Sequence, residues 1–269
     1  MTDNRKTPGG AVLGPSTLLP PVVMLGVVLL IWQAATRIFG WPVFLVPAPT
    51  DVLDALTEDA SRLTHATILT GAAALLGLGV SLIAGVLVSI VFSQSRWIRT
   101  SFYPYAIFLQ TVPIIAIAPL IVSWCGTGFS SVVLVTVIIS LFPIIASTTA
   151  GLLRVDQDLL DLFRLHCASR WQVLLKLRLP HAVPYLVTGA RTSSGMAVIG
   201  AIVGEFFVGH STTHKGLGTL ILLTSAHLKT AHLFAAVLAS TLLGITLFGS
   251  VTLLGSTILS RWQMGSDLE

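Results

Sequence analysis

The chain has 269 residues, of which 54% are hydrophobic and only 10% are charged, and its mean hydropathy is +0.90. Soluble domains carry roughly 25% charged residues, so this composition excludes an ordinary soluble enzyme and indicates a membrane protein. A spanning helix needs about 20 apolar residues, so the length accommodates six such helices and no additional soluble catalytic domain. The net charge is +4, but the basic residues are scattered between apolar runs, which argues against nucleic-acid binding.

Six apolar stretches of roughly bilayer length predict an all-α membrane protein: 18–39, 64–92, 102–122, 130–153, 182–208 and 232–259. They divide the chain into a tail (1–17), a transmembrane domain (18–260) and a second tail (261–269). Ten Lys or Arg residues fall in the set of segments that contains both tails, and four fall in the opposite loops. The positive-inside rule therefore predicts a multi-pass protein of the inner (plasma) membrane, with both termini and the loop 154–181 in the cytoplasm.

Small residues and prolines predict how the spans pack. Residues spaced four apart offer smooth faces for close helix contact: Ala73, Gly77, Ser81 and Gly85, and Gly200 with Gly204. Four prolines are expected to kink or interrupt the third and fourth spans: Pro104, Pro113, Pro119 and Pro143. A third helix that breaks at Pro113 would line a path through the membrane, where water or neighbouring helices satisfy the freed carbonyls.

Two outer segments have patterns of their own. The segment 46–62 reads as a short amphipathic helix on the outer face, with Thr50 as N-cap and Asp51 in the first turn. In the loop after the fifth span, a flexible turn just before another apolar run is formed by Gly216, Leu217 and Gly218.

The loop 154–181 is polar enough to leave the membrane and still has helical periodicity. Asp156 is the expected N-cap of a first helix, and Asp158 and Asp161 near its start and Arg164 in its last turn suit the helix dipole. Its apolar side is formed by residues at i, i+3, i+4 and i+7: Leu159, Leu162, Phe163 and His166.

A second helix in this loop is expected to begin at Ser169, which forms a capping box with Gln172, and to end before Pro180. The pattern admits two interpretations. Either the two helices lie on the membrane surface, where basic residues meet anionic lipid, or they bind a groove of a soluble partner. Periodicity alone leaves both open.

The loop resembles the cytoplasmic signature loop of ABC-importer permeases, in which a Glu-Ala-Ala triplet, a Gly and a final Leu-Pro stand at fixed spacing. Here Asp161, Leu162 and Phe163 take the triplet positions, Cys167 takes the Gly position, and Leu177, Leu179 and Pro180 complete the spacing without a gap. Residues 168–172 resemble the GASRWQ stretch of the nitrate, sulfonate and taurine branch. Further matches lie across residues 20–260: Pro47, Pro49, Val52, Pro113, Pro119, Gly189, Arg191, Glu205, Gly216, Leu217 and Gly218.

The resemblance implies a type I ABC-importer permease fold, in which the helix 156–167 is a coupling helix that binds a separate ATPase subunit. The residues that it assigns to this contact are Asp161, Leu162, Phe163, Arg164, Cys167, Ala168, Leu179 and Pro180. Four of them depart from the family pattern. Asp161 is shorter than Glu, Leu162 and Phe163 are bulkier than the two alanines, and Cys167 replaces a Gly, which readily adopts a left-handed turn. A non-Gly residue still occupies such a turn at modest cost, so the coupling role is retained.

Polar residues inside the spans are further candidates. Glu205 lies in a strongly apolar run near the outer end of the fifth span, which favours a structural or gating role over direct substrate contact. Arg191, near the cytoplasmic end of the same helix, is about 21 Å away along the axis, so the two do not pair. His210 and His214 have metal-ligand spacing, but Gly209 and Gly216 bracket them, so we interpret these histidines, like His227 and His232, as surface residues.

We therefore predict the membrane subunit of an ATP-driven importer that moves a small nutrient by alternating access. The expected partners are two ATPase subunits, a second permease subunit (another copy of this chain), an extracellular or periplasmic substrate-binding protein and the lipid bilayer. No cofactor, metal or catalytic residue is expected, and without a GxxxxGK[ST] loop ATP must be bound by another chain. The branch implies nitrate, sulfonate or taurine, whereas the run Ile199–Phe206 looks closer to permeases for thiamine-precursor pyrimidines or riboflavin.

Two other classes of protein would require features of their own. A stand-alone secondary transporter or channel would need its own energy source, such as paired intramembrane carboxylates, and the spans offer only Glu205. An intramembrane enzyme would need a nucleophile and a base at matched depth, such as Ser194 with a histidine. All seven histidines fall at span ends or in loops.

Overall fold

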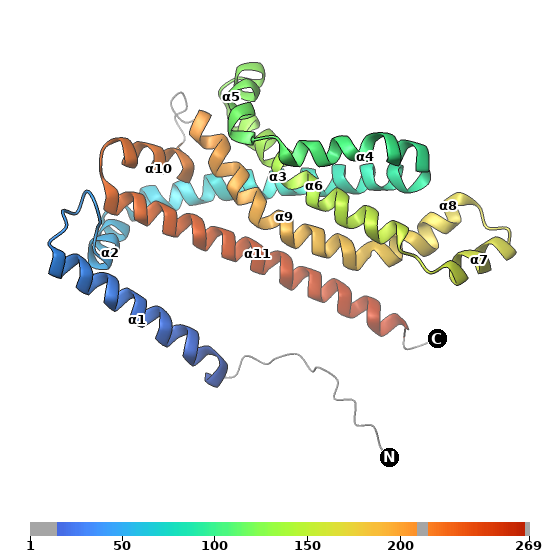
Figure 1. Cartoon of the computed structure of the whole chain (residues 1–269), viewed down its shortest axis with the longest axis horizontal. Coiled ribbons are helices and arrows are strands. Elements are labelled where there is room, and N and C mark those ends of the chain that lie inside the picture. The colour runs from blue at the N-terminus through green and yellow to red at the C-terminus, as the bar shows by residue number, and fades with distance from the viewer. Residues whose placement is uncertain (1–14, 209–214, 267–269) are drawn as a thin grey trace, which may run out of the picture.

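A computed structural model describes residues 15–208 and 215–266, and every regular element in this part of the chain is a helix (Figure 1). Five helices are long and apolar enough to cross a membrane: α1 (Pro15–Phe39), α3 (Ala60–Gln94), α6 (Phe129–Leu153), α9 (Leu179–Val208) and α11 (Thr230–Ser266). The shorter elements are α2 (Pro49–Glu58), α4 (Arg96–Thr111), α5 (Ile114–Cys125), α7 (Gln157–Leu165), α8 (Arg170–Val173), the π-helical turn η1 (Leu174–Arg178) and α10 (Leu217–Ala226). The predicted all-α membrane architecture is confirmed.

The predicted third span, 102–122, is not one continuous helix. It is divided into α4 and α5, and the break falls at Val112 and Pro113 as expected. Val112 has φ −68° and ψ 127°, which is the extended conformation that a following proline imposes. The other three prolines do not end a helix, since Pro104, Pro119 and Pro143 lie inside α4, α5 and α6.

The molecule has two distinct ends (Figure 1). The helices α7 and α8 project beyond the membrane helices at one end, whereas α2 and α10 lie at the other. At the α2 end, the prediction that Thr50 is the N-cap was wrong, because the helix begins at Pro49 and its N-cap is Ala48. Asp51 closes this start instead, with its Oδ2 accepting a hydrogen bond of 2.9 Å from the Ala48 amide.

The core is formed where α6 packs against α3 and α9. A Cβ atom at Gly200 of α9 would lie 2.8 Å from the Thr136 Cα of α6, and one at Gly204 would lie 3.0 Å from the Val132 Cα. Gly77 of α3 allows no Cβ either, because it lies directly against the Thr136 side chain. The predicted close contact through small residues is confirmed, and the backbones of these helices nearly touch.

Serine hydroxyls join the same three helices. Ser81 Oγ of α3 lies 2.9 Å from Ser140 Oγ of α6, and Ser193 Oγ of α9 donates to the Ser140 carbonyl at 2.7 Å. All three residues are fully buried. Hydrogen bonds between helices are worth about 0.6–2 kcal/mol each in a membrane, so they add to the packing and fix the register of the three helices.

We expect the Gly200→Ala substitution to destabilise the protein by about 1–3 kcal/mol, because its methyl group requires the backbones of α6 and α9 to separate. The matched control is Gly195→Ala on the same helix, where a Cβ has no neighbour within 4 Å. Thermal unfolding in detergent measures the difference. Equal melting temperatures for the two variants would contradict the close-packing argument.

Candidate functional site

The helix α7 is closed at both ends by local contacts. At its start, the predicted cap is confirmed, since Asp156 Oδ1 accepts a hydrogen bond from the Asp158 amide at 3.1 Å. At its end, the Ala168 amide bonds the Phe163 carbonyl at 3.0 Å, and the Cys167 amide bonds the Arg164 carbonyl at 2.9 Å. These two bonds form a Schellman motif, in which Cys167 takes the left-handed conformation with φ +50°. The structure thus places Cys167 in the turn for which glycine is the usual residue.

The apolar side of α7 is largely uncovered by the rest of the described chain. Leu159 and Leu162 are 45% and 48% exposed, and Phe163 is half-buried. An open groove runs between α7 and α8 and is lined by Leu162, Phe163, His166, Ala168, Gln172 and Lys176. Asp161 lies on the exposed surface and forms an ion pair of 2.7 Å with Arg164 one turn on. The loop therefore presents an apolar groove with a charged pair beside it.

The second helix of the loop does not end before Pro180, contrary to the prediction. Its capping box is present, with Ser169 Oγ accepting from the Gln172 amide at 3.3 Å, and Gln172 Oε1 accepting from the Ser169 amide at 2.7 Å. From there α8 continues through η1 into α9, so Leu179 and Pro180 open the long membrane helix. The Leu179 amide bonds the Leu174 carbonyl five residues earlier, and this wider turn admits a proline without breaking the helix.

Glu205 occupies a buried site in the last turn of α9, where its carboxylate receives hydrogen bonds from two other helices. Thr70 of α3 donates to both oxygens at 2.8 and 3.0 Å, and the Gly218 amide of α10 donates at 2.7 Å. The Leu217 amide in turn bonds Thr70 Oγ1 at 2.8 Å. Because amides at a helix start carry partial positive charge, the carboxylate caps α10 and ties it to α3 and α9.

The two glycines that flank Leu217 are required by packing, because a larger residue at either position would collide with Glu205. Gly216 has φ −79°, which any residue adopts, but a Cβ on it would collide with the Glu205 carboxylate. At Gly218, a Cβ would lie 2.9 Å from Glu205 Cβ. The sequence suggested a flexible turn here, whereas the structure shows glycines that make room for a buried side chain.

Arg191 and Pro113 lie apart from the Glu205 network. The Arg191 Nη2 donates to the Thr252 carbonyl of α11 at 3.4 Å, and its Nε is buried. Pro113 is exposed at the break between α4 and α5. As predicted, Arg191 and Glu205 are separate features.

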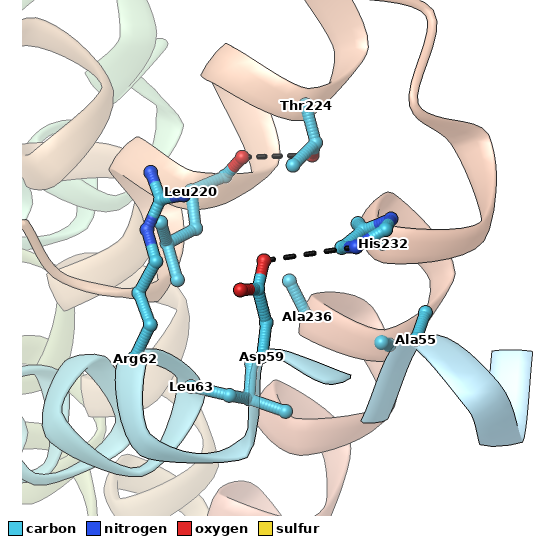
Figure 2. Close-up of a pocket in the computed structure, with 9 residues that line it drawn as sticks. Ala55, Asp59, Arg62, Leu63, Leu220, Thr224, His232 and Ala236 are labelled. Atoms are coloured by element: carbon cyan, nitrogen blue, oxygen red, sulfur yellow. Dashed lines mark hydrogen bonds and ion pairs between the residues drawn. The ribbon is translucent and has the colours of Figure 1, made fainter. Parts of the chain in front are cut away.

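The end of the molecule that carries α2 and α10 holds a small pocket between the α2–α3 corner, α10 and α11, shown in Figure 2. His232 of α11 points toward Asp59, with Nε2 to Oδ2 at 3.6 Å, and lies 3.7 Å from Glu58 Oε2. Its side chain is 22% exposed, so His232 is a partly buried residue at the edge of the pocket. His227 is exposed as predicted, and His210 and His214 lie outside the described residues.

Comparison with known proteins identifies the family. Residues 77–260 match the family model described as "Binding-protein-dependent transport system inner membrane component", which covers more than half of the chain. The chain belongs to this family. The protein is thus an ABC transporter permease of an importer family, and permeases of this kind are transport subunits that work with ATPase and binding-protein partners.

Several curated permeases are similar over most of their length. A probable ABC transporter permease protein of Haemophilus influenzae is 36% identical over 79% of this chain and 85% of its own. The riboflavin transport system permease protein RibX of Chloroflexus aurantiacus is 34% identical over 77% of this chain and 76% of its own. The formylaminopyrimidine transport permease protein ThiX of Halalkalibacterium halodurans is 33% identical over 74% of this chain and 78% of its own.

Among the contacts that the sequence did not indicate are three between residues far apart in the chain. Thr70 bonds a carboxylate 135 positions away, Asp59 faces His232, and Arg178 Nη1 donates to the Ser93 carbonyl at 2.8 Å. A threonine inside a membrane helix usually bonds its own helix backbone, so nothing local marks Thr70. For Arg178 there is only a general physical reason, because a cation is favoured near the C-terminus of a helix and Ser93 lies near the C-terminus of α3.

We expect Cys167→Gly to slow amide hydrogen exchange in α7 about two- to fivefold. A left-handed conformation costs an L-residue roughly 1–2 kcal/mol, and the extra freedom of unfolded glycine offsets only part of the gain. The control is Cys125→Gly, which removes the other exposed cysteine from the end of α5. If both variants leave α7 exchange unchanged, the turn at Cys167 is not strained.

We expect Gly216→Ala to destabilise the permease by about 2–3 kcal/mol, because its methyl group displaces the buried Glu205 carboxylate from its donors. Gly128→Ala is the control, since Gly128 also caps a helix in an extended conformation. A Cβ atom added at Gly128 would lie no closer than 3.7 Å to a neighbouring atom, the Ser130 Oγ. In the double variant with Glu205→Ala, the two costs should not add. Full additivity in thermal unfolding would show that the two residues are independent.

Proposed function

We propose that this permease is the membrane subunit of an ATP-driven importer, in which two copies of the chain pair with two ATPase subunits and a substrate-binding protein. The observation that carries the proposal is α7, a short helix held outside the membrane helices and capped at both ends. Its apolar residues Leu159 and Leu162 are exposed in the described chain. An apolar surface of this kind marks a contact with another protein.

The coupling role rests on the shape of the loop. A helix that only lay on lipid would need one apolar stripe, whereas here α7 and α8 together line a groove with Phe163, Ala168 and Gln172. The ion pair of Asp161 with Arg164 lies exposed beside the groove and offers charge at the rim of a contact. We therefore favour a soluble ATPase partner over a lipid surface as the occupant.

The proposed path and gate lie in different parts of the bundle. The break at Pro113 divides one crossing into α4 and α5, and irregular backbone at membrane depth is tolerated where it lines a water-filled path. Arg191 lies near the middle of α9 and faces α11. At the outer end, Glu205 joins three helices, so we assign it to the structure that closes the outer gate rather than to substrate contact.

The proposed substrate class is a nitrogen heterocycle of the pyrimidine or flavin type. The riboflavin and formylaminopyrimidine permeases share 34% and 33% identity with this chain, whereas a nitrate permease of Synechocystis shares 24%. The sulfonate and taurine permeases, at 27–31%, define the second class to screen. Selection itself is assigned to the binding protein.

The test is a tagged purification from native membranes in mild detergent, followed by mass spectrometry. We expect an ATPase subunit at one to one with this chain. Its binding protein is then screened for riboflavin, formylaminopyrimidine, taurine and sulfonate. Recovery of the permease alone, even after crosslinking, would favour a stand-alone secondary transporter or channel.

Leu162→Glu and Asp161→Lys are expected to reduce ATPase recovery and substrate uptake more than tenfold, because each places a wrong charge in the proposed contact. The control is Asp54→Lys, which changes an exposed carboxylate on α2 at the opposite end of the molecule. Normal uptake by the Asp161→Lys variant would count against the coupling role.

A further inference from the structure

Arg178 joins the end of the cytoplasmic loop to a different membrane helix. Its Nη1 donates a 2.8 Å hydrogen bond to the carbonyl of Ser93, the residue before the last of α3. The two residues are 85 positions apart. A guanidinium at a helix C-terminus faces the negative end of the helix dipole, so the bond is charge-assisted.

The π-helical turn that carries Arg178 is anchored in the core. Leu174, its first residue, is 1% exposed and lies in one apolar cluster with Leu152 of α6 and Ala182 of α9. Ile90 of α3 packs against the same cluster. Single π-helical turns are frequent at functional sites, where an irregular turn changes the direction or register of a helix.

Besides its chain connection to α6 and the packing of Leu174, two connections join the loop to α9 and α3. The first is covalent, because α8, η1 and α9 form a continuous helix from Arg170 to Val208. The second is the bond from Arg178 to Ser93 of α3. On the proposed coupling function, we infer that Arg178 is a positioning residue that transmits movement of α7 to α3, while η1 transmits it to α9.

The contacts of Arg178 argue against a purely stabilising role. Its side chain is only half-buried. Within the described residues, no salt bridge connects Arg178 to a carboxylate. Removing this cation therefore deletes one hydrogen bond and no ion pair, so its effect on fold stability is expected to be small. Its effect on transmission is expected to be larger.

The test uses the complex of the permease with its co-purified ATPase, reconstituted with its binding protein and ligand. Amide hydrogen exchange is measured without nucleotide and with ATP plus vanadate, at the end of α3 (88–94) and at the start of α9 (179–186). In the wild type, both segments should respond to nucleotide. In Arg178→Ala, the α9 response should persist and the α3 response should fall.

The same variant should transport about tenfold less substrate per ATP hydrolysed, which is the scale expected for losing one charge-assisted hydrogen bond from a coupling path. Arg178→Lys, which keeps a cationic donor, should recover most of the α3 response. Arg154→Ala is the control, because it removes an exposed positive charge from the start of the same loop.

Three outcomes would overturn the inference. In the first, Arg178→Ala shows a wild-type α3 response and wild-type transport per ATP. In the second, it melts at a much lower temperature, loses ATPase and transport in proportion, and exchanges faster with or without nucleotide, which indicates a merely structural role. The third is recovery of no ATPase with the wild-type chain, which refutes the proposed function itself and this inference with it.

Discussion

The constraint on which the rest of the structure depends is the close approach of helix backbones in lipid. Lipid tails are as apolar as leucine, so burial of apolar surface gives these helices no drive to associate, and contact must come from packing and interhelical hydrogen bonds. Gly200 and Gly204 bring α9 within contact of the α6 backbone, and Gly77 does the same for α3. The Ser140 hydrogen bonds lie in the same interface. These contacts join α3, α6 and α9 into a single packed unit to which the other elements attach.

The helix α9 connects both candidate regions through this unit. Gly204 lies against α6, and the next residue, Glu205, turns its carboxylate toward α3 and α10. The depth at which α9 packs therefore fixes the position of the Glu205 network. At the other end, the same helix continues backward through η1 into the loop 154–181. In the proposed function, a displacement of that loop along α9 would be transmitted through a close-packed and therefore stiff interior.

Local signals in the sequence predicted local structure well. The spacing of small residues located the helix contacts, Asp156 and Ser169 located two helix starts, and the Cys167 position in the family pattern located a left-handed turn. Pro180 was misread, because the rule that proline ends a helix assumes a continuous α-helical ladder, whereas a wider turn precedes it here. Contacts between residues distant in sequence, such as Thr70 with Glu205, left no local pattern to detect. The role of the glycines beside Leu217 also became visible only once Glu205 was placed in space.

The two ends of the molecule are held by bonds of different strength. The Glu205 carboxylate is buried, and opening its network would leave the carboxylate and the Gly218 amide without hydrogen-bond partners. Near the loop 154–181, the end of α3 is held by one hydrogen bond from the half-buried Arg178, beside the packing of Ile90 against Leu174. The contacts near the loop therefore cost less to rearrange than the Glu205 network. In the proposed cycle, motion begins there, and the outer helices follow as one unit because α3, α9 and α10 share the Glu205 carboxylate.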